Sequence, residues 1–126
     1  MRKKPRRNLL DSFRNAGSGL LFIIEYERNA RIHLVAALVV ILMGFWLGLG
    51  RIEWALIIAA IGLVFAGEML NTVVELTIDL ICPGPHVLAK HAKDVAAGAI
   101  LVSAVIAMLI GLLILGPPLL QRVGLQ

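Results

Sequence analysis

Residues 66–80 read AGEMLNTVVELTIDL, an apolar stretch interrupted by four regularly placed polar side chains: Glu68, Asn71, Glu75 and Asp79. A helix turns by about 100° per residue, so this spacing places all four on one face. Burying three acids and an amide along an otherwise apolar helix costs free energy. Such residues are rarely kept without a use, and the stripe therefore indicates a functional site.

The composition of the whole chain points to a membrane. Its 126 residues allow one domain, and 60% of them are hydrophobic while 16% are charged. A soluble globular domain has fewer apolar and more charged residues. A single cysteine, Cys82, excludes an internal disulfide and a metal site made of cysteines alone.

Three apolar runs are long enough to cross a bilayer, which takes about 20 residues in a helix. The first is interrupted by His33, and the third stops at the sequence Gly116-Pro117-Pro118. We predict transmembrane helices over residues 29–50, 52–82 and 87–116.

The region before the first span has a different pattern. Residues 1–28 begin with a basic tail, and from Asn8 to Glu25 apolar residues recur at roughly helical spacing with polar residues between them. This pattern is typical of an amphipathic helix lying in the membrane interface. The expected fold class is an all-α membrane protein with one surface helix and three spans.

The basic residues predict the orientation. Of the twelve Lys and Arg residues, eight precede the first span, two lie between the second and third, and two fall on the other side. By the positive-inside rule the N-terminus and the loop 82–93 are cytoplasmic, and the C-terminus is outside, in a plasma or inner membrane. The positive charge suits anionic lipid headgroups, and a nucleic-acid partner is not expected.

Depth along the second span divides the polar stripe. If Trp54 anchors the outer interface, about 20 residues inward reach roughly Val73. Glu68 then lies within the cytoplasmic half of the bilayer, whereas Glu75 and Asp79 emerge into headgroups or water. This layout suits an enzyme that joins a lipid headgroup to a soluble cosubstrate.

Each polar residue of the stripe has a chemical and a structural interpretation. Glu68, held out of bulk water, suits a general base, and the alternative is a protonated glutamate bonded between helices. Glu75 and Asp79 can hold a divalent cation, and the alternative is a solvated helix end. Asn71 can orient a phosphate or bond between helices.

Further polar residues flank the spans. Glu27 can supply another metal ligand, although the pattern alone favours a charged interfacial collar. Lys93 can bind phosphate as a point charge, and Asp94 is favourable near a helix N-terminus in any case. His33 alone is more often a packing residue than a ligand.

The number of helices favours an oligomer. Three helices hardly surround a polar site, and small residues spaced four apart at the start of the third span allow close helix packing. We therefore expect a homo-oligomeric helix bundle.

Three ordered motifs carry a family resemblance. They are EMLNTVVELTID over residues 68–79, HVLAKHAKDVAAGA over 86–99 and ERNARIH over 27–33. Together they resemble the prokaryotic diacylglycerol kinase and undecaprenol kinase family of small integral-membrane lipid kinases. The similarity extends from about residue 10 to 115.

The resemblance implies ATP-dependent phosphorylation of a lipid hydroxyl by a homotrimer with sites between protomers. Glu68 looks like the general base, and Glu27 and Glu75 look like ligands of the Mg²⁺ that accompanies ATP. The residues that look like the nucleotide site are Asn71, Asp79, Gly84, Pro85, His86, Lys93 and Asp94. The chain departs from the family at Asn15, where an aromatic residue is usual, and in its proline-rich loop 82–85.

The motifs around residues 27–33 and 89–98 resemble the undecaprenol kinase branch more than the diacylglycerol kinase branch. Undecaprenol is therefore the first substrate expected, and diacylglycerol is the alternative. A non-enzymatic alternative is a small oligomeric proton or ion transporter that uses the acid stripe as a relay. A holin-like assembly needs no acid stripe and ranks last.

Overall fold

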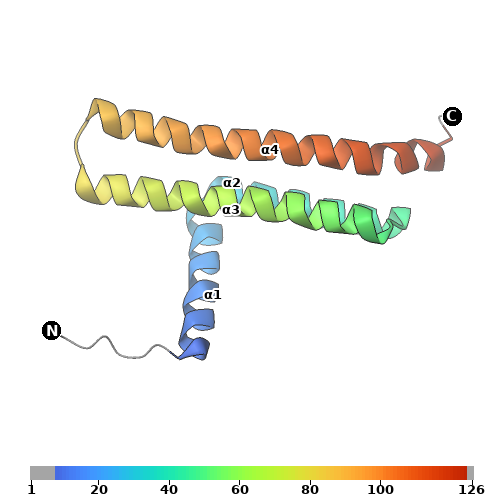
Figure 1. Ribbon diagram of the computed structural model, residues 1–126, viewed down its shortest axis with the longest axis horizontal. Coiled ribbons are helices and arrows are strands. Elements are labelled where there is room, and N and C mark those ends of the chain that lie inside the picture. The colour runs from blue at the N-terminus through green and yellow to red at the C-terminus, as the bar shows by residue number, and fades with distance from the viewer. Residues whose placement is uncertain (1–7, 125–126) are drawn as a thin grey trace.

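The computed structural model describes residues 8–124, which form four α-helices and contain no strand. The helices are α1 (Leu9–Tyr26), α2 (Arg28–Leu47), α3 (Arg51–Ile81) and α4 (Val87–Arg122). Helices α2, α3 and α4 lie side by side, and α1 stands at a steep angle to them (Figure 1). The all-α prediction is confirmed for this part of the molecule. The predicted basic tail, residues 1–7, lies outside the described residues.

The turn between α1 and α2 is made by one residue. Glu27 has an extended backbone (φ −99°, ψ 119°), and its N–H donates to the carbonyl of Ile23 at 2.8 Å. Because helical geometry stops for this residue alone, the two helices join at a sharp corner. Leu10 and Phe13 on α1 are 77% and 75% exposed, which leaves an apolar surface on this helix.

Helices α2, α3 and α4 are each long and apolar enough to cross a membrane. Their large apolar side chains face outward in many places, as at Leu42, Ile58 and Leu113. A soluble monomer rarely exposes continuous apolar surface of this extent, whereas lipid tails cover it without cost. The chain is an integral membrane protein.

The two longest helices form the main packing unit. α3 and α4 make the most extensive contact in the chain, and residues 82–86 connect them. Gly67 of α3 faces Ser103 and Ile100 of α4 at this contact. At 31 residues α3 is about 46 Å long, which exceeds a hydrocarbon core of about 30 Å, so one end projects into headgroups or water.

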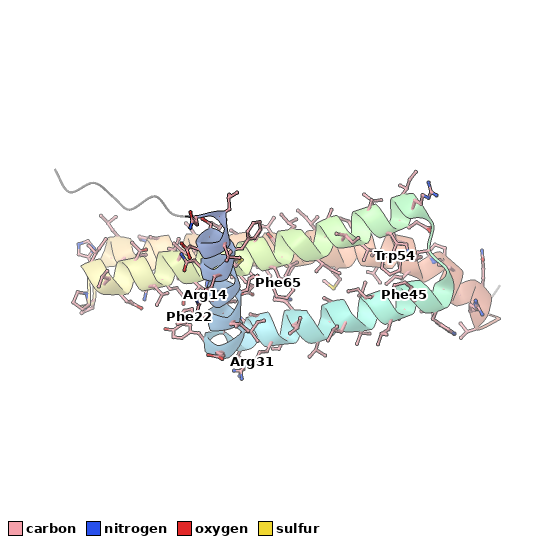
Figure 2. All side chains as sticks on the ribbon, turned by 90° about the horizontal axis from the view of Figure 1, so that it is seen from below. Arg14, Phe22, Arg31, Phe45, Trp54 and Phe65 are labelled. Atoms are coloured by element: carbon pink, nitrogen blue, oxygen red, sulfur yellow. The ribbon has the colours of Figure 1, made fainter. Side chains whose placement is uncertain are left out.

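At the end of the bundle away from α1, aromatic residues fix α2 against α3. The Phe45 and Trp54 rings lie 4.8 Å apart, and both are seen at this end in Figure 2. A Cβ on Gly44 would come within 2.8 Å of the Trp54 ring. α2 then stops at Leu47, three residues before the predicted limit of its span, because Gly48 adopts a left-handed conformation (φ 72°) that ends the helix.

The predicted end of the third span at Gly116-Pro117-Pro118 is not a helix end. α4 continues through both prolines to Arg122. Proline removes a helical N–H, but membrane helices tolerate it where neighbouring contacts compensate. Here Arg122 holds the last turn, since its guanidinium donates to the Trp46 carbonyl at 3.3 Å and lies 5.6 Å from the Trp46 ring centre.

Candidate active site

The polar stripe of α3 continues an apolar stripe on the same face. The buried residues of this helix recur every three or four positions: Ile57, Ala60, Val64, Glu68, Asn71 and Thr72. Such spacing keeps them on one side of a helix. The buried face is therefore apolar up to Val64 and polar from Glu68 onward.

Glu68 is the most enclosed acid described, with 1% of its side chain exposed. Its Oε1 lies 3.2 Å from Nε2 of His33 on α2, but the two groups are not aligned as a hydrogen bond and Oε1 has no hydrogen-bond partner in residues 8–124. The Thr72 hydroxyl bonds to the Glu68 backbone carbonyl at 3.0 Å and leaves the carboxylate free. This carboxylate thus retains its capacity to accept a proton.

The sequence alone did not assign His33 to the site. We predicted a packing role, whereas its ring reaches the Glu68 carboxylate. The available signal was its position as the one polar interruption of a long apolar run, which marks a functional candidate in a membrane helix.

One turn beyond Glu68, an amide and an acid are joined. Asn71 Nδ2 donates to Glu75 Oε1 at 3.1 Å, and the buried Asn71 Oδ1 has no partner in the described chain. Glu27, at the α1–α2 corner, and Glu75 both lie close enough for their charges to act on the Glu68 carboxyl.

No group of three or more His, Cys, Asp and Glu side chains in residues 8–124 is arranged to hold a metal ion. Glu27 and Glu75 nevertheless offer carboxylate oxygens, and the unpaired Oδ1 of Asn71 adds a neutral one. Oxygen donors of this kind are what Mg²⁺ binds, usually with phosphate and water completing its shell.

A lysine from α4 lies at the exposed end of the polar stripe. Lys93 Nζ on α4 lies 2.5 Å from Asp79 Oδ1 on α3. Asp94, which follows Lys93 on α4, forms an ion pair with Lys90 at 2.6 Å. Asp79 is thus paired with a lysine. Both ion pairs are substantially exposed to solvent.

The loop residues predicted for nucleotide binding lie at this same end. His86 caps α4, with its Nδ1 accepting from the Leu88 N–H at 3.2 Å, and the Gly84 carbonyl accepts a weak bond from the Cys82 thiol at 3.6 Å. Gly84, Pro85 and His86 are exposed. They belong to the exposed end of α3 and α4, apart from the buried acid.

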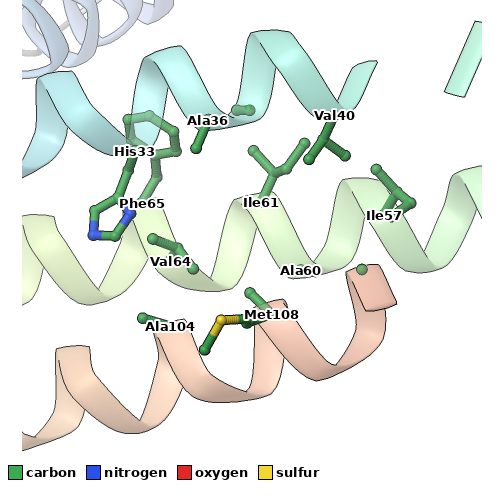
Figure 3. Close-up of a pocket in the computed structure, with 13 residues that line it drawn as sticks. His33, Ala36, Val40, Ile57, Ala60, Ile61, Val64, Phe65, Ala104 and Met108 are labelled. Atoms are coloured by element: carbon green, nitrogen blue, oxygen red, sulfur yellow. The ribbon is translucent and has the colours of Figure 1, made fainter. Parts of the chain in front are cut away.

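A cavity of about 370 Å³ lies between α2, α3 and α4. Its lining is apolar apart from one side chain, His33, which stands at one end while Val40 and Ile57 lie towards the other (Figure 3). α4 contributes Ala104 and Met108. His33 also contacts Glu68, so the buried carboxylate lies next to the residue at one end of this apolar cavity.

Comparison with known proteins places this arrangement in a family. A profile of prokaryotic diacylglycerol kinases matches residues 14–115. The chain belongs to the prokaryotic diacylglycerol kinase family. The undecaprenol kinase of Bacillus subtilis is 47% identical over 123 residues, covering 94% of this chain and 100% of the relative.

Other members of the family are also similar. The diacylglycerol kinase of Synechocystis is 41% identical over 128 residues, covering 94% of this chain and 73% of its own, and that of Escherichia coli K12 is 32% identical over 75 residues, covering 60% and 62%. The matched segment of the family profile includes every residue that the sequence assigned to the site.

Proposed function

We propose that this family member transfers the γ-phosphoryl group of ATP to the hydroxyl of a membrane lipid. The observation that carries the proposal is the buried Glu68 carboxylate, which lies 3.2 Å from His33 at one end of an apolar cavity. An enzyme that phosphorylates a lipid alcohol needs a base where the headgroup stops and the tail begins. Membership of the family and the similarity to two kinds of lipid kinase support it.

Undecaprenol is the proposed substrate, and diacylglycerol is the alternative. The relative covered over its whole length is an undecaprenol kinase, whereas the family profile and the Synechocystis relative are named for diacylglycerol. The cavity has the size of a small-molecule site and is apolar enough for either lipid chain.

Glu68 acts as the general base in this proposal. It receives the proton of the lipid hydroxyl while the oxygen attacks the γ-phosphorus in line with the departing ADP. Enclosure of the carboxylate keeps competing water away from the attacked phosphorus, which favours transfer to the lipid over hydrolysis.

Glu27 and Glu75 would hold the divalent ion, proposed as Mg²⁺, through their carboxylate oxygens, with Asn71 orienting Glu75. The oxygen-rich donor set and the unpaired Asn71 Oδ1 fit such an ion. A cation bound there neutralises negative charge on the transferred phosphoryl group.

The nucleotide is proposed to lie along the exposed end of α3 and α4. Lys93 is proposed to bind the phosphates of the nucleotide with its positive charge. To do so, its ammonium group either leaves Asp79 or contacts Asp79 and the phosphates together. The other members of this proposed site are Asn71, Asp79, Gly84, Pro85, His86 and Asp94. Apart from Asn71, which is buried and bonded to Glu75, these residues are exposed at one end of α3 and α4, which suits a ligand that arrives from water.

The protein is proposed to work as a homotrimer in the plasma or inner membrane, with its N-terminus and active site cytoplasmic and its C-terminus outside. Ala97 and Ala99 on α4 are exposed, and Gly98 beside them meets open space. A second copy can approach closely at such small residues. The excess of basic residues at the proposed cytoplasmic side supports the orientation.

The transporter alternative is less well supported. A relay needs polar groups along its path, but beyond His33 the cavity wall is apolar.

The experiment uses purified protein in nanodiscs with γ-³²P-labelled ATP, offered undecaprenol and diacylglycerol side by side. We expect label in the lipid fraction, with undecaprenol preferred. The proposal would be overturned if no label entered the lipid fraction and the protein carried protons across liposomes without ATP. Preference for diacylglycerol would correct the substrate.

A further inference from the structure

His33 connects the buried acid to the cavity. Its Nε2 lies 3.2 Å from Glu68 Oε1, and its ring also lines the cavity between α2, α3 and α4. The His33 side chain is 25% exposed, against 1% for Glu68. The pair therefore joins an enclosed carboxylate to a titratable group that reaches the surface of the chain.

A buried base has to release its proton before it can act again. No hydrogen bond from a side chain in residues 8–124 reaches the Glu68 carboxylate, because Asn71 bonds to Glu75 and Thr72 bonds to a backbone carbonyl. His33 is the neighbour in contact with it. Histidine exchanges protons near neutral pH, which suits this position better than an amide or a hydroxyl.

We propose that His33 is a proton relay and positioning residue for Glu68, an inference that rests on the proposed lipid kinase function. As the lipid oxygen bonds to the γ-phosphorus, the bond from that phosphorus to the bridging oxygen breaks and ADP leaves. The hydroxyl proton passes to Glu68, then to Nε2 of neutral His33, and the imidazolium releases a proton to water. Glu68 is thereby returned to its ionised form.

The charges around the pair are compatible with this path. α3 contributes Glu68 and Glu75, and the α1–α2 corner contributes Glu27. From α4 the cavity wall receives only residues without a titratable group: Ala104, Ala107, Met108 and Gly111. A transient positive charge on His33 thus forms beside the Glu68 carboxylate, and the cavity wall from α4 adds no cation to oppose it. Arg28 and Arg31, in the first turn of α2, are exposed to solvent.

The alternative is that His33 merely holds α2 against α3. A hydrogen-bonding side chain that does not titrate near neutral pH would serve that structural role equally well. His33→Gln keeps an amide close to Glu68 and cannot relay, whereas His33→Ala leaves room for added imidazole. The matched control is His91→Gln, because His91 is exposed on α4 outside the cavity.

The test measures kcat and KM of the full-length protein in nanodiscs over about pH 5 to 8, where histidine titrates. For His33→Gln we expect kcat to fall about 100-fold with KM for lipid and ATP altered less than about twofold, and a changed pH profile. Added imidazole is expected to restore turnover in His33→Ala. Wild-type kcat and pH profile in His33→Gln would overturn the relay.

A second measurement does not depend on turnover. In protein labelled with ¹⁵N-histidine, NMR titration follows the three imidazoles separately. Glu68→Gln is expected to shift the titration of His33 and to leave His86 and His91 unchanged. An unchanged His33 contradicts the relay whatever the activity, whereas absence of lipid phosphorylation by the unaltered protein contradicts the proposed function itself.

Discussion

Lys93 Nζ lies 2.5 Å from Asp79 Oδ1, so an ion pair joins α4 to α3 at the exposed end of the polar stripe. The two side chains are 36% and 59% exposed. Ion pairs in contact with water contribute little to stability, because solvent screens them and long side chains lose freedom. Under the proposed function, Lys93 serves there to bind the phosphates of the nucleotide.

Replacing Lys93 with methionine keeps an unbranched side chain one atom shorter and removes its charge. We expect KM for ATP to rise and kcat to fall by about 10- to 100-fold, with the thermal midpoint almost unchanged. Steady-state kinetics and thermal unfolding in detergent check both. The charge swap Asp79→Lys with Lys93→Asp restores the pair but misplaces the cation, so recovered activity would show that the pair acts only as a structural link.

Glu68→Gln removes the proposed base while keeping the shape of the side chain. We expect kcat to fall by about 10² to 10⁴, the usual contribution of general-base catalysis, with assembly preserved by size-exclusion chromatography. Glu53→Gln is the matched control, because Glu53 on α3 only caps the Gly50 N–H at 2.6 Å. Full activity of Glu68→Gln would show that Glu68 is not the general base.

Glu75→Gln tests the proposed ion site. The amide keeps the hydrogen bond from Asn71 Nδ2 within reach but loses the negative charge that a divalent cation prefers. We expect the Mg²⁺ concentration for half-maximal activity to rise more than about tenfold, with maximal turnover partly recovered at high Mg²⁺. An unchanged Mg²⁺ dependence would place the ion elsewhere.

Much of the site was predictable because one helix carries it. Helical spacing alone placed Glu68, Asn71 and Glu75 on one face, and the structure buries the first two and bonds Asn71 to Glu75. Hydropathy was equally informative, since the three long apolar helices follow from composition and length.

Contacts between helices were harder to predict. The rotation of α2 about its axis decides whether His33 meets Glu68 or lipid, and no spacing within one helix determines that rotation. The prolines near residue 117 predicted an end to α4, but Arg122 stabilises a further turn through Trp46, far away in the sequence. The partner of Asp79 likewise depends on how the loop 82–86 returns the chain.

Gly44→Ala is expected to destabilise the end of the bundle away from α1. The new Cβ would lie 2.8 Å from the rigid Trp54 ring, and overpacking of this kind costs about 1–3 kcal/mol. Gly62→Ala is the control, because nothing lies within 4 Å of its Cβ position and alanine favours a helix by about 0.5–1 kcal/mol. Thermal unfolding in detergent should separate the two variants, and equal midpoints would contradict the close contact.

The cavity can be filled from α4 to test whether it receives the lipid chain. Ala104→Leu places a larger apolar side chain into a volume of about 370 Å³ whose wall includes Ala104. We expect KM for a long-chain lipid to rise about tenfold while KM for ATP stays unchanged, because the nucleotide is proposed to lie at the exposed end.

Ala99→Leu is the control for this substitution, since Ala99 lies on the same helix, is exposed and does not line the cavity. A lipid with a truncated chain adds a second comparison. If the chain occupies the cavity, Ala104→Leu should penalise the long lipid more than the short one, because only the long chain reaches the filled region. Equal penalties for both lipids, or a rise in KM for ATP alone, would show that the chain lies along the outer surface of the helices.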